Sequence, residues 1–90
     1  MIFLVSYDLK APNRNYDDLY ATLKTAKAWW HYLESTWLLY TDDGICEWQK
    51  KIKCVIDDND SFIVIDITKQ ERNGWLPKKA WEWIRVHENK

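Results

Sequence analysis

Ile2-Phe3-Leu4-Val5-Ser6-Tyr7-Asp8 is a run of mostly apolar and β-forming residues that ends in an acid. Such a run predicts a strand over residues 2–8. Because side chains alternate along a strand, one face would carry Ile2, Leu4, Ser6 and Asp8, and the other Phe3, Val5 and Tyr7. The strand would therefore hold the Asp8 carboxylate at a rigid end, a position from which small enzymes present metal ligands.

Strands and helices alternate along the rest of the chain, because the apolar period changes repeatedly between two and three to four. We expect a helix over 15–27, a long strand over 28–40, a helix over 44–57, a strand over 61–68 and a short closing helix over 78–87. A fourth strand or a bend has room within 29–40 or 68–75. This order predicts an α+β, ferredoxin-like βαββαβ domain over residues 1–90, with two helices on one face of an antiparallel sheet and the other face open for association.

The aromatic content favours self-association. Seven Trp, five Tyr and two Phe in 90 residues carry more aromatic surface than one small core encloses, since each ring buries about 150–250 Å² when packed. Part of this surface would face a second subunit, as expected for a homodimer whose sheets meet. The alternative is that these rings are half exposed at the rim of the core.

The charges limit the partners. Thirteen basic and fourteen acidic residues give a net charge of −1, so binding to RNA or DNA would have to be local. The candidate basic patches are Lys50, Lys51 and Lys53, then Lys78 and Lys79, then Lys10 with Arg14. Solvated helix and loop faces are the favoured interpretation of all three patches.

The two cysteines predict a reduced, cytoplasmic protein. Cys46 and Cys54 fall in one expected helix, about 12 Å apart along its axis, whereas a disulfide needs Cα atoms within about 7 Å. We therefore expect buried free thiols. Charged residues interrupt the apolar N-terminal run, and no stretch is long enough for a membrane span, so neither a signal peptide nor membrane association is expected.

Asp8 is the main candidate for chemistry. On the open face, a two-fold axis could bring the Asp8 carboxylates of two subunits together. The pair would repel unless a cation lay between them, and Mg²⁺ commonly takes one or two carboxylates plus waters. Such a site could activate water against a phosphodiester. The alternative, which the residues alone favour, is that Asp8 caps the strand end or binds backbone amides of the 10–14 loop.

Other polar and aromatic residues have weaker claims. We interpret His31 as a packed or interface histidine. Glu34 and Ser35 would lie within the long strand, where they could either face Asp8 or satisfy each other. The acidic run over 57–60 lacks the Gly and the distal Glu of a calcium loop and predicts a turn. Base stacking would be tested on Trp29, Trp30 and Trp75, although Trp at such spacing is more often part of a core.

Several short motifs resemble the SinR-like branch of the CRISPR-associated Cas-two superfamily, and together they span nearly the whole chain. They are Val5-Ser6-Tyr7-Asp8-Leu9, Tyr16-x-x-Leu19, Leu33-Glu34-Ser35-Thr36-Trp37-Leu38, the acidic turn before Phe62-Ile63-Val64-Ile65, and Gly74-Trp75-Leu76-Pro77-Lys78-Lys79-Ala80-Trp81-Glu82-Trp83-Ile84. The resemblance implies a ferredoxin-like homodimer whose sheets face each other. It also implies that Asp8 ligates a divalent metal and that Ser35 matches a recurrent serine of the second strand.

The leading hypothesis is therefore a cytoplasmic, Mg²⁺-dependent endonuclease that acts on RNA or DNA, with Asp8 as metal ligand and catalytic residue, Ser35 as a second catalytic candidate, and Tyr7 or Glu34 in support. The slightly acidic charge and the Trp-rich helical tail argue against a role in spacer acquisition. The alternative is a non-catalytic dimeric interaction or regulatory module, antitoxin-like or phage-encoded, with a protein partner. A third hypothesis is a dimer that binds single strands through Trp30.

Overall fold

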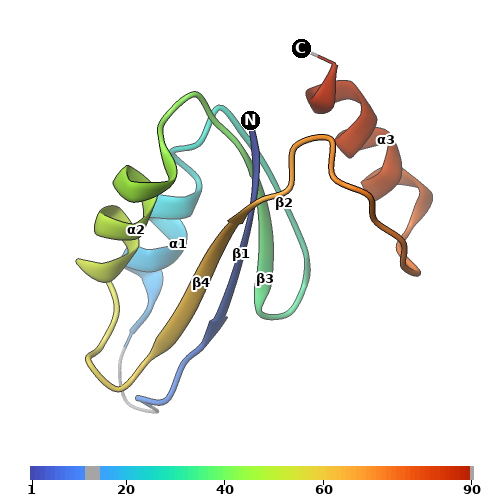
Figure 1. Cartoon of the computed structure of the whole chain (residues 1–90). Coiled ribbons are helices and arrows are strands. Elements are labelled where there is room, and N and C mark those ends of the chain that lie inside the picture. Colours follow the sequence, from blue (N-terminus) through green and yellow to red (C-terminus); the bar gives the residue numbers. More distant parts are fainter. Residues whose placement is uncertain (12–14, 90) are drawn as a thin grey trace.

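The computed structural model describes residues 1–11 and 15–89 and has four strands and three helices in that part of the chain (Figure 1). In chain order they are β1 (Ile2–Asp8), α1 (Asp17–Leu23), β2 (Ala28–Leu33), β3 (Thr36–Tyr40), α2 (Ile45–Lys53), β4 (Ser61–Asp66) and α3 (Lys78–Glu88). The strands form one antiparallel sheet in the order β2-β3-β1-β4. The α+β prediction is confirmed, and this arrangement is compatible with a ferredoxin-like fold.

The expected long strand over 28–40 is a hairpin. Glu34 and Ser35 turn the chain between β2 and β3, so the placement of these two residues within one strand was wrong. The turn contains no Gly, Asn or Pro, which are the usual sequence signals for a hairpin. A register shift between Trp30 and Leu33 then brings Leu33 opposite Thr36.

The first two helices are shorter than their apolar periodicity predicted. After α1 ends at Leu23, the amide of Thr25 bonds the carbonyl oxygen of Thr22, which is the spacing of a tighter turn. In the same way, α2 ends at Lys53, and Cys54 follows as its C-terminal cap. Helix ends commonly tighten in this way. The apolar stripe of each segment therefore extends past the last helical residue, and the stripe alone overestimated the length of the helix.

The main core lies between the sheet and the pair α1 and α2, which cover the same face (Figure 1). Its buried members are Phe3, Val5, Tyr7, Leu19, Leu23, Trp37, Leu39, Trp48, Ile52 and Ile56. The odd-numbered residues of β1 belong to this core, as alternation predicted. Thr41 is the buried polar residue beside it, and its hydroxyl oxygen accepts hydrogen bonds from the Trp48 indole N–H and the Asp43 amide, both at 3.0 Å.

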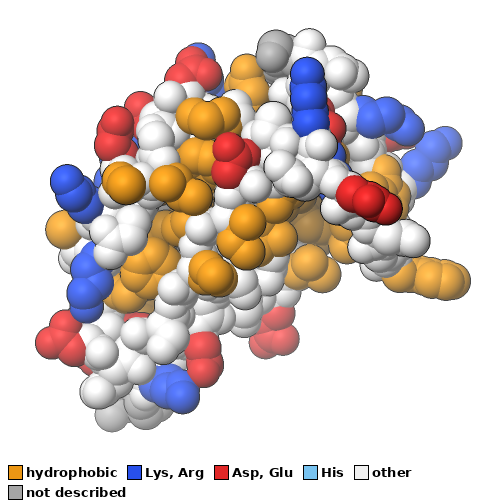
Figure 2. All heavy atoms as spheres, in the orientation of Figure 1, with side chains coloured by type: hydrophobic (Ala, Val, Ile, Leu, Met, Phe, Trp, Pro, Cys, Tyr) orange, Lys and Arg blue, Asp and Glu red, His pale blue; other side chains and the backbone are white. Residues whose placement is uncertain are grey.

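Helix α3 packs against the opposite face of the sheet, which we had expected to stay open (Figure 1). A second apolar cluster forms there from Ile2, Trp30, Leu38, Ala80 and Ile84. The covered area is limited, because Ile63 and Ile65 on the same face of β4 remain 54% and 43% exposed. Figure 2 shows hydrophobic side chains at the surface over β4 and between the sheet and α3.

Both cysteines are free, as predicted, but the prediction that they are buried was wrong. Cys46 follows the first residue of α2, Cys54 caps its end, and both are exposed. Among the described residues, no helix has the length and apolar character needed to cross a membrane.

Candidate metal site at the end of β1

Asp8 ends β1 on the sheet face that carries α3, but beyond the area that α3 covers. It lies opposite Ser61 of β4, and its side chain is 69% exposed. Its carboxylate oxygen Oδ2 is 3.4 Å from Nζ of Lys10. A shallow hollow at this position is lined by Ser6, Tyr7, Asp8, Ser61, Phe62 and Ile63.

The alternative role considered for Asp8 was to bind backbone amides of the loop after the strand, and Asp60 performs this role instead. The Lys10 amide donates to Oδ1 of Asp60 at 2.7 Å, the Asp57 amide donates to Oδ2 at 2.8 Å, and the Tyr16 hydroxyl donates to both oxygens. Asp60 therefore ties the loop after β1 to the turn before β4. The acidic run over 57–60 is a turn, as predicted.

Tyr16 shows the effect of this arrangement on a titrating group. Desolvation is the largest cause that raises the pKa of its phenol above the ordinary value of 10.0, and the hydrogen bond to Asp60 raises the pKa further. The neutral phenol is therefore the form that donates to the carboxylate.

The other predicted site residues do not gather around Asp8. The Ser35 carbonyl oxygen accepts a hydrogen bond from the Tyr7 amide at 3.1 Å, so Ser35 extends the ladder opposite Tyr7. Glu34 and Ser35 are exposed in the hairpin turn. Tyr7 itself points into the main core, where its hydroxyl oxygen accepts a hydrogen bond from the Trp37 indole at 3.0 Å. Tyr7 can therefore position the end of β1, but its side chain lies on the opposite face of the sheet from the Asp8 carboxylate.

The residues of one chain fit a divalent metal only in part. Mg²⁺ takes one or two carboxylates together with waters, and Asp8 offers one exposed carboxylate beside the hydroxyls of Ser6 and Ser61. Within residues 1–11 and 15–89, no group of three or more His, Cys, Asp or Glu side chains could hold a metal ion. A second carboxylate at Asp8 would have to come from another subunit.

His31 is a packed residue, in agreement with the sequence. Its ring stacks on Trp37 with centroids 4.0 Å apart, and Nε2 lies 3.2 Å from the Glu34 carbonyl oxygen. Trp29 also contacts Trp37, at 5.3 Å between ring centroids, and Lys24 Nζ lies 5.2 Å from the centre of the Trp29 ring. These residues line an open pocket on the α1 side of the sheet, opposite to Asp8.

The tryptophans proposed for base stacking differ in exposure. Trp30 is only 6% exposed and belongs to the α3 cluster, so it is a core residue. Trp29 is partly exposed beside Lys24, and Trp75 is fully exposed.

The candidate basic patches are partly neutralised. Lys51 pairs with Asp43, Lys53 pairs with Asp58, and Lys10 pairs with Asp8. Arg14, which we grouped with Lys10, lies outside the described residues. Lys78 and Lys79 are exposed in the first turn of α3. The interpretation as a solvated helix face therefore describes the patch of Lys50, Lys51 and Lys53 well.

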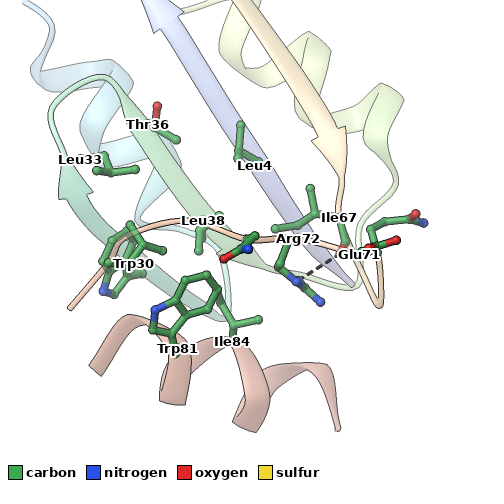
Figure 3. Close-up of a pocket in the computed structure, with 13 residues that line it drawn as sticks. Leu4, Trp30, Leu33, Thr36, Leu38, Ile67, Glu71, Arg72, Trp81 and Ile84 are labelled. Carbon is green, nitrogen blue, oxygen red and sulfur yellow. Dashed lines mark hydrogen bonds between the residues drawn. The ribbon is translucent and has the colours of Figure 1, made fainter. Parts of the chain in front are cut away.

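A cavity of about 190 Å³ lies between the sheet and the segment that contains α3 (Figure 3). Leu4 and Leu38 form its sheet wall, Trp81 and Ile84 come from α3, and Arg72 closes one side with a hydrogen bond to the Ile67 carbonyl oxygen at 3.3 Å. Sequence reasoning missed this cavity. The helical spacing of Trp81 and Ile84 was the signal available, because it showed that α3 has an apolar side that must pack on something.

No family model, curated protein or solved structure matches this chain. The similarity to the Cas-two superfamily therefore stays a prediction.

Proposed function

We propose that this protein is a cytoplasmic homodimer, similar to the Cas-two superfamily, that hydrolyses RNA or DNA phosphodiesters with a divalent metal held by Asp8. The observation that carries the proposal is the position of Asp8: it is exposed at a strand end on the part of the sheet face that α3 leaves uncovered. Ile63, beside it, offers apolar surface for a second sheet.

The second subunit supplies what one chain lacks. Two Asp8 carboxylates that meet across a two-fold axis repel each other, and this repulsion favours uptake of a cation between them. A bound Mg²⁺ would lower the pKa of its water and stabilise charge on the phosphate. Lys10, 3.4 Å from Asp8, can then leave its ion pair and face a phosphate oxygen of the substrate.

Incubation with labelled RNA and DNA, with Mg²⁺ and with chelator, tests this activity. Asp8→Ala should abolish Mg²⁺-dependent cleavage. Asp58→Ala removes a fully exposed acid in the turn after α2 and should retain cleavage. Cleavage by folded Asp8→Ala at the rate of the unmodified protein would contradict the proposal, as would absence of Mg²⁺-dependent cleavage by the unmodified protein.

A non-catalytic interaction module is the second candidate, and the exposed apolar residues favour it. Ile63, Ile65 and Trp75 are accessible on one chain, and apolar surfaces of this kind mark protein contacts. A specific antitoxin-like or phage-encoded partner recovered with the protein, without polymer cleavage and without an effect of metal on melting, would favour this function over hydrolysis.

A further inference from the structure

Trp75 projects from the protein without a contact that covers it. Its relative exposure is 100%, the largest among the exposed apolar residues. It lies between Gly74 and Leu76 in the extended segment that joins β4 to α3, and a side chain added at Gly74 would meet nothing within 4 Å. A tryptophan buries about 150–250 Å² when packed, so leaving this ring in water is costly unless it has a binding site elsewhere.

The cavity beneath α3 has the size and chemistry to take one such ring. Its volume is about 190 Å³, and its walls are mainly apolar. An apolar cavity of about 150 Å³ already holds a benzene molecule. Trp30 and Trp81 line the cavity and offer aromatic faces for an incoming indole (Figure 3).

Trp75 is next to the cavity wall along the chain. Leu76, the residue after Trp75, lines the cavity together with the neighbouring Gln70, Glu71, Arg72 and Asn73. An isologous two-fold contact requires this closeness, because each chain must offer the donor and the acceptor surface to the same neighbour. A donor on the far side of the molecule would instead make a head-to-tail contact, which closes into a ring or continues as an open filament.

We propose that Trp75 of each chain inserts into the α3 cavity of a second copy, and that this reciprocal contact fixes the homodimer. The inference rests on the proposed homodimer and adds its anchor. Leu33 and Ile65, 44% and 43% exposed, lie beside the cavity: Leu33 lines it, and Ile65 pairs with Leu4 of its wall. The second copy would cover both residues.

Analytical ultracentrifugation from low to high micromolar protein tests the contact. Because a buried tryptophan anchor is typically worth at least 2 kcal/mol, Trp75→Ala should raise the dimer dissociation constant about thirtyfold or more. Trp29→Ala, which removes a partly exposed tryptophan from the other face, should leave the constant within a fewfold of its original value. Leu33→Phe, which narrows the cavity from a half-exposed position, should weaken the dimer without removing the indole.

Fluorine NMR of protein labelled with fluorotryptophan gives a second measurement. The Trp75 resonance, assigned from Trp75→Ala, should shift with concentration along with the dimer population. A folded Trp75→Ala that dimerises as tightly as the unmodified protein overturns the Trp75 contact and leaves the homodimer intact. A monomer at every concentration overturns the homodimer as well. A Trp75 signal that is buried independently of concentration would show that the ring fills its own cavity, which also overturns the contact between copies.

Discussion

The Trp37 indole N–H donates a hydrogen bond to the Tyr7 hydroxyl oxygen at 3.0 Å inside the main core. Trp37 belongs to β3, and Tyr7 is the residue of β1 that precedes Asp8. The bond joins the two central strands at the end where the candidate site lies. The exposed carboxylate of Asp8 is therefore held by a backbone that the core fixes.

Tyr7→Phe should lower the free energy of unfolding by about 1–3 kcal/mol, because it leaves the buried Trp37 N–H without an acceptor. Urea unfolding followed by circular dichroism measures the change. Tyr32→Phe is the matched control, since Tyr32 is 71% exposed and its substitution should change stability by less than about 0.5 kcal/mol. Equal stability of the two variants would show that the Tyr7–Trp37 bond contributes little.

Stability should fall as the pH rises above 10. Burial is the largest cause that raises the pKa of Tyr7 above its ordinary value of 10.0, while the hydrogen bond from Trp37 opposes the shift. The folded state then keeps the phenolic proton at a pH where the unfolded chain loses it, so this stabilisation is complete below pH 10 and is lost as the pH rises through the folded pKa. Urea midpoints measured across this range should fall less steeply for Tyr7→Phe, and a slope that does not change would contradict the assignment to Tyr7.

Trp30→Ala should destabilise the protein by about 3–5 kcal/mol, because it removes a large side chain from the α3 cluster. Trp29→Ala should cost less, since that ring is 41% exposed. Chemical unfolding of both variants gives the comparison. If single-stranded nucleic acid binds, fluorescence titration at several salt concentrations should show weakened binding in Trp29→Ala rather than in a folded Trp30 variant.

Mg²⁺ should raise the melting temperature of the unmodified protein and leave that of Asp8→Asn unchanged. In the presence of chelator, the free energies of unfolding of the two proteins should differ by no more than about 1 kcal/mol, because both side chains of the Asp8–Lys10 ion pair are exposed. Differential scanning calorimetry with and without the metal tests both statements. An equal Mg²⁺ shift in Asp8→Asn would show that the ion binds elsewhere.

Both thiols should react with a disulfide reagent in the native protein, since Cys46 and Cys54 are exposed. Two equivalents of released chromophore are expected without denaturant, and Cys46→Ser and Cys54→Ser should each release one. Reaction only after denaturation would indicate that both cysteines are covered in solution.

Much of the fold could be predicted from local patterns. The period-two run of β1 gave both the strand and the face of Asp8, because the odd-numbered residues pack under the helices and the even-numbered residues face the other way. The apolar spacing of Trp48 and Ile52 likewise gave the buried side of α2. In both elements, local periodicity and tertiary burial agree, and this agreement is why the prediction succeeded.

The errors arose where local and tertiary preferences differ. The turn at Glu34 and Ser35 has ordinary residues, and the neighbouring strands share their β-forming character, so a single strand and a hairpin look alike in sequence. Cysteine is usually buried, but Cys46 lies on the outer side of α2. The helical spacing of Trp81 and Ile84 showed that α3 must pack on something, but it did not specify the sheet face of Leu38 or a cavity beneath the helix.

The two apolar clusters, on opposite faces of the sheet, also suggest two levels of local stability. Release of α3 would expose Ala80, Ile84 and their neighbours but would leave the cluster under α1 and α2 intact. Amide protons of α3 should then exchange with deuterated solvent through a partial opening, whereas those of β1 and β3 should exchange only through global unfolding. The C-terminal helix would then behave as a separate cooperative unit that is less stable than the rest of the domain.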